Sequence, residues 1–289
     1  MPVTRSRRRR NLLASTPVFL LPWQLSPTVV AAIALAAALY GRGSGRTRPP
    51  VPAARRTAFY LALLVIYAAL QTSWEYYASH MIFVLQLQHF ALHDLAPVLL
   101  AWSVPRAALA AGLPGHAYVR AIRAKRAMHA LMRLPLNPFV AGTTYVASLL
   151  VWVWPPVTFD VMLSNGLYRL MSWGVLAGAL PFWLLVLDPR PYPFARLKPG
   201  QRIVMLHLVM LPVVLTGAAL SLSRSNWYPV YAVCGRFLPI PPIADQQLGG
   251  VVMWVLGAAL YAVAFFIVLG RNLEQEEAAL TVRQLPDHS

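Results

Sequence analysis

Residues 80–97 read HMIFVLQLQHFALHDLAP, and the same apolar character continues to residue 103. A run of this length can cross the about 30 Å of hydrocarbon in a bilayer as one α-helix. Ionisable side chains are costly inside such a helix and almost always face the interior of a helical bundle. The stretch therefore predicts a membrane-spanning helix whose polar side faces other helices.

The composition of the whole chain is typical of a membrane protein. Of its 289 residues, 58% are hydrophobic and only 12% are charged, whereas about a quarter of the residues are charged in a soluble domain. We therefore predict an all-α fold, a polytopic transmembrane helical bundle of about seven spans. The predicted spans run approximately over 24–41, 57–73, 80–103, 137–157, 168–188, 202–223 and 248–270.

The positive charges lie mainly between the predicted spans. The formal net charge is +16, and the loops 42–56, 104–136 and 189–201 are rich in Arg and Lys. The positive-inside rule predicts that these three loops and the C-terminus are cytoplasmic and that the N-terminus is outside. We expect contacts with anionic lipid headgroups and no nucleic-acid partner, because no basic soluble domain is long enough to provide one. The spacing in 104–136 predicts a basic amphipathic helix on the membrane surface.

The two ends of the chain differ from the transmembrane domain, which we assign to 23–270. Residues 1–22 form a basic segment with five arginines between positions 5 and 10, which conflicts with an outward N-terminus. A cleaved signal, a re-entrant stretch or an eighth span would each resolve the conflict. Residues 271–289 are expected to form a charged cytoplasmic tail that begins as a helix.

The third predicted span contains an unusual set of ionisable residues. His89 and His93 are four residues apart, so both rings lie on one helical face and could ligate a metal. His80 begins the span at the outer surface, and Met81 adds a thioether. Asp94 lies near mid-bilayer, where it must be paired, protonated or bound to a cation. Three interpretations stay open: a structural hydrogen-bond cluster, a proton or ion pathway, and a metal site.

The sixth and seventh spans offer secondary candidates. Met205, His207 and Met210 follow one another in the sixth span, and thioether with imidazole favours copper, especially Cu(I). Methionines also fill space in membrane helices, so Met205 and Met210 can equally be packing residues. In the seventh span Met253 lies on the side that carries two glycines and is expected to point into the bundle. Asp245 is predicted to be the N-cap of that span.

The sequence contains no enzyme signature. There is no nucleophile elbow, no phosphate-binding glycine loop and no catalytic carboxylate pair. Cys234 is the only cysteine, which excludes an internal disulfide framework and a Cys-pair metal site. We therefore expect a protein without catalytic turnover.

Three stretches of the chain resemble the CtaG family of cytochrome c oxidase assembly factors, bacterial inner-membrane proteins with about seven spans. The first runs from Gln88-His89 to Ala96-Pro97 and Val104-Pro105. The second is LTGA at 215–218 with WYPVY at 227–231, and the third is ADQQLGG at 244–250 with Met253-Trp254. The resemblance extends from about Trp23 to Gly270. It implies a multi-pass protein of the bacterial inner membrane that works with cytochrome c oxidase subunits.

The resemblance also implies a role in copper delivery to haem–copper oxidase. The chain departs from the family pattern at two places: Pro155 follows Trp154 where members have His, and Tyr168 and Ser172 stand where members tend to have two His. The working hypothesis is an outward-opening site that holds copper transiently and consists of His80, His89 and His93, helped by Met81 or Asp245. The alternatives are a metal-free scaffold for oxidase assembly and a proton or cation transporter that uses Asp94 and His93.

Overall fold

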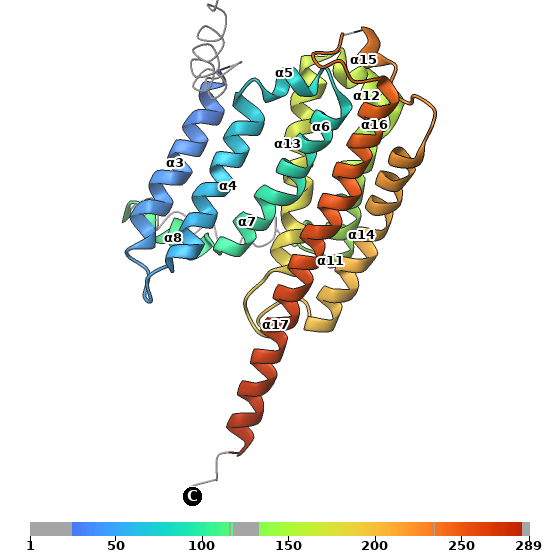
Figure 1. Ribbon diagram of the computed structural model, residues 1–289. Coiled ribbons are helices and arrows are strands. Elements are labelled where there is room, and N and C mark those ends of the chain that lie inside the picture. Colours follow the sequence, from blue (N-terminus) through green and yellow to red (C-terminus); the bar gives the residue numbers. More distant parts are fainter. Residues whose placement is uncertain (1–24, 116, 118–132, 234, 285–289) are drawn as a thin grey trace, which may run out of the picture.

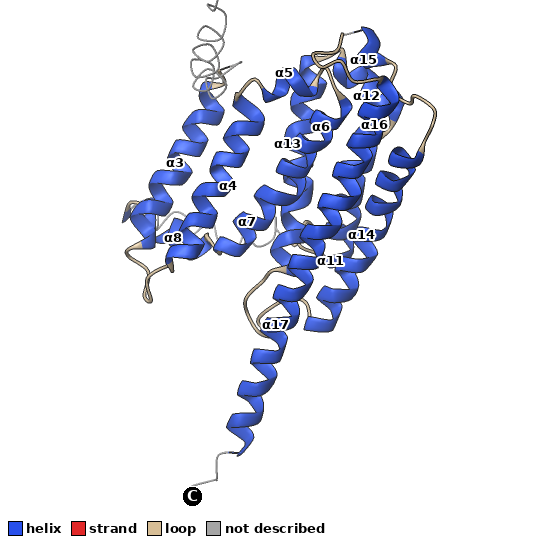
Figure 2. Ribbon diagram, viewed as in Figure 1, coloured by secondary structure: helices blue, strands red, loops and turns tan. Residues whose placement is uncertain are grey.

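The computed structural model describes residues 25–115, 117, 133–233 and 235–284, with side chains described as far as Glu277. Within these residues the regular structure is helical and there is no strand (Figure 2). The prediction of an all-α transmembrane bundle is therefore confirmed. Six helical segments of the described chain are long and apolar enough to cross a membrane, and a bent helix pair would be the seventh.

The six continuous segments correspond closely to six of the predicted spans. They are α3 (Pro27–Ser44), α4 (Ala53–Gln71), the segment Ile82–Ser103, α13 (Asn165–Val186), α14 (Pro199–Leu222) and the segment Pro242–Glu277. The last of these starts six residues earlier than predicted and continues as one helix to Gln284, so α17 projects beyond the bundle (Figure 1). The length of each apolar run located the spans, because a helix must be long and apolar enough to cross the bilayer. The length of the apolar run does not indicate where a helix ends once it has left the bilayer.

The fourth predicted span, 137–157, is not one straight helix. Helix α11 (Pro138–Val153) ends before Trp154, and α12 (Pro155–Met162) leaves at an angle of 69°. Proline lacks an N–H, and it forces the preceding residue out of the helical region. Trp154 accordingly has an extended backbone with ψ of 121°. The two prolines after it, Pro155 and Pro156, then start the new helix.

Two spans contain a π-helical stretch in their middle. In the third span, η1 (Phe90–Leu95) separates α6 (Ile82–His89) from α7 (Ala96–Ser103). In the last span, η2 (Val252–Leu256) separates α16 (Pro242–Val251) from α17 (Gly257–Gln284). The two π-helical stretches contact each other. Such stretches are rare and are frequently found at functional sites.

The helices run alternately up and down, so their connections gather at two ends. Short helices α5 (Trp74–Ala78), α12 and α15 (Val230–Val233) lie at the upper end in Figure 1, which we call the α5 end. Helix α8 (Arg106–Gly112) lies at the opposite end, which we call the α8 end, beside α3 (Figure 1). By the charge distribution, the α5 end is predicted to face outward. Only α8 and the last residues of the predicted amphipathic segment 104–136 are well described; most of the remainder lies outside the described residues.

Glycines allow several helices to approach closely. A Cβ on Gly43 would lie 1.7 Å from the Ala108 carbonyl oxygen, where α3 meets α8. A Cβ on Gly250 would lie 2.4 Å from Ser221 Oγ and 2.5 Å from its backbone nitrogen, where α16 meets α14. Small residues drive helix association in membranes in this way. Gly250 therefore permits the close approach of α16 and α14.

At the α8 end, arginines bind backbone carbonyls of the connection that follows α13. Arg202 donates to the carbonyls of Asp188, Arg190 and Leu197, and Arg271 donates to the Leu187 carbonyl at 2.8 Å. Burial alone would raise the pKa of Asp188, but hydrogen bonds and charge from Arg190 hold it below its usual value. These contacts satisfy helix-end carbonyls and fix the turn between α13 and α14.

Candidate functional site: a buried polar cluster beside the π-helical turn

The carboxylate of Asp94 lies inside the bundle and is hydrogen-bonded. Asp94 is on η1 and accepts a hydrogen bond from the Tyr145 hydroxyl of α11. Since the Tyr145 hydrogen is used in this way, the Tyr261 hydroxyl of α17, 2.7 Å away, donates to Tyr145. Asp94 was predicted to be paired, protonated or bound to a cation. Within the described residues it is paired, through a hydrogen bond from Tyr145. The chain Tyr261–Tyr145–Asp94 joins three spans.

His93 also acts as a link between helices. Its Nε2 lies 3.0 Å from the backbone oxygen of Tyr145 and 3.3 Å from Ser148 Oγ. A carbonyl oxygen only accepts, so Nε2 bears the proton in this arrangement. The other nitrogen, Nδ1, lies 3.4 Å from Asp94 Oδ1 without hydrogen-bond geometry. The backbone oxygen of His93 accepts from the Trp183 indole at 3.2 Å.

His89, the last residue of α6, has a different partner. Its Nε2 lies 3.4 Å from the sulfur of Met171 on α13, and both side chains are fully enclosed in the bundle. Its Nδ1 is buried and has no hydrogen-bond partner among the described residues. Buried polar groups are nearly always satisfied, so this nitrogen needs an explanation. Within the described part of the chain, His89 and His93 therefore share no hydrogen-bond partner, although their spacing predicts that both lie on one helical face.

A second hydrogen-bond chain lies beside His89. The Tyr168 hydroxyl donates to Gln88 Oε1, and Gln88 Nε2 donates to the Ala69 carbonyl at 2.7 Å. The Ser172 hydroxyl donates to the Tyr168 backbone oxygen at 3.0 Å. Tyr168 and Ser172 are the positions where the CtaG resemblance leads us to expect His. In this chain Tyr168 forms a hydrogen bond to another span, and Ser172 forms one within α13.

Asp245 caps a helix other than the one that its place in the sequence predicts. The predicted role as N-cap of the last span is wrong, because that helix begins at Pro242 and Asp245 lies within its first turns. Its two carboxylate oxygens accept from the backbone N–H groups of Ile82 and Phe83, at 3.2 and 3.0 Å, and it forms an ion pair with Arg236. Asp245 therefore caps α6, a helix distant in sequence, because tertiary packing brings the start of α6 beside α16.

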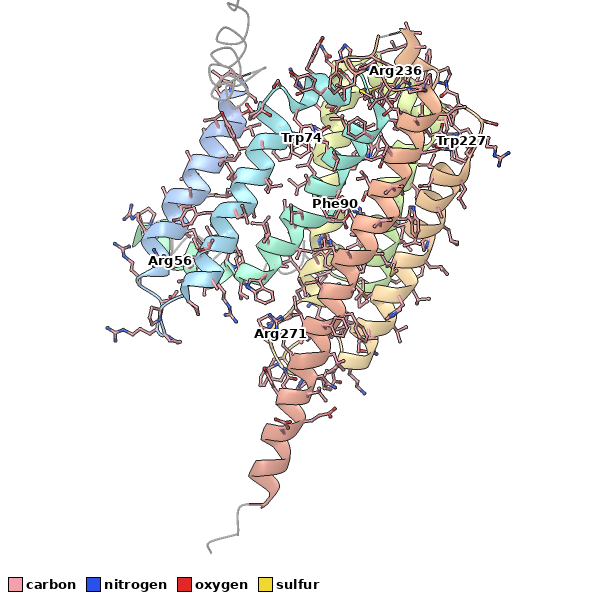
Figure 3. The ribbon with its side chains drawn as sticks, in the orientation of Figure 1. Arg56, Trp74, Phe90, Trp227, Arg236 and Arg271 are labelled. Atoms are coloured by element: carbon pink, nitrogen blue, oxygen red, sulfur yellow. The ribbon has the colours of Figure 1, made fainter. Side chains whose placement is uncertain are left out.

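The five residues of the predicted copper site do not come together. His80 is at the α5 end, where its Nδ1 contacts the Tyr76 carbonyl at 2.6 Å, and Met81 and Asp245 lie at the adjacent start of α6. His89 is seven residues beyond Ile82, about 10 Å deeper at about 1.5 Å per residue. Figure 3 places Phe90, the next residue, at mid-height in the bundle and Arg236 at the α5 end. A single site of these five residues is therefore excluded by their spacing along the helix.

The secondary candidates are also dispersed. His207 points out of the bundle, with its Nδ1 2.8 Å from the Ile203 carbonyl. Met205 and Met210 are partly buried packing residues, and Met253 points into the bundle as predicted. Among the described residues no three His, Cys, Asp or Glu side chains are arranged to hold a metal ion. Among the described residues, His89 and Met171 form a close pair of soft donors.

A cavity of about 270 Å³ opens near the α5 end, between α3, α4, α6 and α13. Its lining includes Glu75, Gln88, Tyr168 and Ser172. Glu75 belongs to α5, outside the spans, and burial raises its pKa above the usual value against the opposing charge of Arg169. The cavity therefore combines a partly desolvated carboxyl group and the guanidinium group of Arg169 with side-chain amide and hydroxyl groups.

Several residues of the cluster were not predicted from the sequence. Tyr145, Met171 and Tyr261 lie in the fourth, fifth and seventh spans, where the sequence analysis singled out none of the three. Tyr145 and Tyr261 are ordinary residues of membrane helices, and nothing in their spacing indicates Asp94 as a partner. Met171 lies beside Ser172, at a departure from the family pattern, which is the one signal that could have drawn attention to it.

The fold and this cluster define a polytopic helical membrane protein with a buried, inter-helix polar centre. Comparison with protein families gives the identity at family level: the model of the cytochrome c oxidase caa3 assembly factor (CtaG) family matches residues 38–275. The chain belongs to this family, so the resemblance inferred from the three motifs is confirmed. No curated protein and no solved structure matches the chain.

Proposed function

We propose that this protein assists assembly of a cytochrome c oxidase by holding Cu(I) transiently at His89 and Met171 and releasing it to an oxidase subunit. Membership of the family supports the assembly role. The observation that supports copper as the cargo is the buried pair of His89 Nε2 and Met171 Sδ, 3.4 Å apart. We place the protein in the bacterial inner membrane, with delivery at the outer face and the C-terminus in the cytoplasm.

The chemistry of the pair suits this cargo. Imidazole and thioether are soft donors that select Cu(I) over hard cations. A nitrogen and a sulfur ligand of one tetrahedral ion lie about 3.5 Å apart, from bond lengths of about 2.0 and 2.3 Å. A site with only two protein ligands holds its ion weakly enough to pass it on. Enclosure in apolar surroundings also favours a neutral imidazole, the form that binds metals.

The test is the copper content of the detergent-purified protein after loading with Cu(I). We expect the wild type to retain copper and the variants His89→Ala and Met171→Leu to lose it. His207→Ala is the matched control, because His207 points out of the bundle, and it should retain copper as the wild type does. Equal copper in the wild type and in both pair variants, or none in the wild type, would refute copper holding at this pair.

A metal-free scaffold is the second candidate, and one observation favours it. The polar side chains at three expected ligand positions are already engaged within the protein. Tyr168 donates to Gln88 of another span, Ser172 donates to the Tyr168 backbone oxygen within α13, and Asp245 is engaged by Arg236 and two backbone N–H groups. The cluster would then serve to hold the bundle in the shape that an oxidase subunit recognises. Co-purification with an oxidase subunit that survives His80→Ala, His89→Ala and His93→Ala together would support this candidate.

A further inference from the structure

The cavity at the α5 end is lined by buried polar side chains and by exposed apolar ones. Gln71, Gln88 and Tyr168 are its buried polar residues near the bundle interior. Leu25, which precedes α3, and Trp173 on α13 also line it and are 64% and 42% exposed. Exposed apolar side chains on the outside of a membrane bundle face lipid, and Trp is typical of the headgroup level. The cavity therefore offers polar contacts inside and apolar contacts at its edge.

Two opposite charges line the same cavity. Glu75 belongs to α5 and Arg169 to α13. Burial raises the pKa of the Glu75 carboxyl group above its usual value, although the charge of Arg169 acts in the other direction. Arg169 therefore compensates the carboxylate only in part, and a second cation beside Glu75 would stabilise its charged form. Guanidinium groups bind phosphate oxygens well. The two side chains thus complement a ligand that carries one cation and one phosphate.

The side-chain amides of the cavity add hydrogen-bond donors. Gln71 Nε2 donates to the Leu70 carbonyl at 2.8 Å, and Gln88 Nε2 donates to the Ala69 carbonyl at 2.7 Å. An amide nitrogen carries two hydrogens, and each of these bonds uses one. The second hydrogen of each amide can be donated to a ligand oxygen, which suits the phosphate and ester oxygens of a lipid headgroup.

The size of the cavity suits a headgroup and not a whole lipid. Its volume is about 270 Å³, close to the about 300 Å³ at which small-molecule sites begin. Acyl chains must therefore lie outside it, along exposed side chains such as Leu25 and Trp173. A headgroup with a phosphate and a primary ammonium matches both charges. A choline headgroup has no N–H to donate to Glu75, and an anionic headgroup without an amine provides no cation.

We propose that this cavity binds the headgroup of an aminophospholipid of the phosphatidylethanolamine type, with its ammonium group at Glu75 and its phosphate at Arg169. The inference does not depend on copper, because carboxylate and guanidinium groups recognise the lipid by charge and hydrogen bonding. The cavity is lined by residues at the start of α3, at the end of α4 and on α13. A bound lipid would therefore hold these three spans together at the α5 end.

Native mass spectrometry of the purified full-length protein measures which lipids it retains. The micelles contain equal amounts of phosphatidylethanolamine, phosphatidylcholine and phosphatidylglycerol with identical acyl chains. We expect the wild type to retain phosphatidylethanolamine severalfold over the other two. Glu75→Gln should reduce this preference severalfold, and Arg169→Gln should lower the retention of all three lipids. The controls are Glu274→Gln on α17 and Arg224→Gln, both exposed and outside the cavity lining; they should retain lipids as the wild type does.

The comparison of lipids on the wild type alone is decisive, even if a variant fails to fold. Equal retention of the three lipids would overturn the proposal. A preference for phosphatidylethanolamine that persists unchanged in Glu75→Gln and Arg169→Gln would place the lipid elsewhere and would also overturn it. Soluble phosphoethanolamine carries the same charges without acyl chains, and it should not displace the lipid at an equal concentration. Displacement would show that the cavity takes a soluble zwitterion and not a membrane lipid.

Discussion

Asp94 illustrates what a single ionisable residue requires inside a membrane helix. Its carboxylate is almost fully buried, and the Tyr145 hydroxyl is its hydrogen-bond donor from another span. A charged acceptor without a donor in such a place costs considerably more than the net value of an ordinary hydrogen bond. The hydrogen bond between Tyr145 and Asp94 therefore stabilises one particular position of α11 relative to η1.

Replacing Tyr145 with Phe removes the donor and leaves the Asp94 carboxylate unsatisfied. We expect the free energy of unfolding to fall by about 1–3 kcal/mol, the usual cost of a stranded buried group. Denaturant titration in detergent micelles, followed by tryptophan fluorescence, measures the change. Tyr60→Phe is the control, since Tyr60 is exposed and its hydroxyl makes a weak 3.4 Å contact. Adding Asp94→Asn should recover part of the loss, and an unchanged double variant would argue against this account.

At the scale of single elements, the ends and contacts of helices decide the architecture. Helix α6 begins at Ile82, and its first backbone N–H groups have no acceptor within their own helix. They donate instead to the carboxylate of Asp245 on α16. Helices α14 and α16 approach so closely at Gly250 that no side chain fits. The Asp245 cap brings the last span to the third, where the two π-helical stretches meet, and the glycine contact brings the last span to the sixth.

Asp245→Ala removes the cap of α6 and leaves the Arg236 guanidinium without its carboxylate. Breaking a buried ion pair by removing one partner costs about 3–5 kcal/mol, and we expect a loss at the lower end of that range because Arg236 is partly exposed. The same unfolding titration measures it. The double variant Asp245→Ala/Arg236→Gln should be more stable than Asp245→Ala alone. Equal stability of the two variants would show that the unpaired charge contributes nothing.

Gly250→Ala tests the contact between α14 and α16. The added methyl would meet the backbone nitrogen of Ser221 at 2.5 Å, so the helices must separate, and we expect a destabilisation of about 1–3 kcal/mol. Gly257→Ala in the same span is the matched control, because its methyl would have 3.9 Å to the nearest atom. A lower melting temperature for Gly250→Ala alone is the expected result. Similar melting temperatures for the two variants would contradict the close approach.

For the whole molecule, the distribution of charge predicts an orientation. The α8 end carries the arginine-rich connections, and the α5 end carries Glu75 and Asp160. Basic loops stay on the cytoplasmic side, and the cavity at the α5 end would then open toward the outside. The proposed delivery of copper at the outer face therefore requires this orientation.

Reporter fusions test this orientation. A reporter that is active only in the cytoplasm should be active when fused after Gln284 and inactive when fused within the 74–79 connection. A reporter that folds only outside the cytoplasm should give the opposite result at both positions. Reversed activities would place the α5 end on the cytoplasmic side and would contradict the proposed orientation.

About the candidate site, the sequence predicted the residues of one helix and missed their partners. His89, His93 and Asp94 were found because ionisable groups are rare in an apolar run. Their contacts with Met171, Tyr145 and Tyr261 depend on how neighbouring helices are rotated and shifted, which hydropathy does not describe. The predicted five-residue site failed because residues far apart along a helix cannot reach one ion.

The sequence by itself determined the class of the protein, the approximate limits of its spans and its family, because a bilayer imposes a length and an apolar composition on every helix that crosses it. Three motifs sufficed for the family, which the match over residues 38–275 confirms. Only the tertiary structure decided that Asp245 caps α6, that Pro155 bends the fourth span by 69°, and that His89 faces Met171. Those features arise from packing between helices, where the register of one span against another sets which polar groups meet.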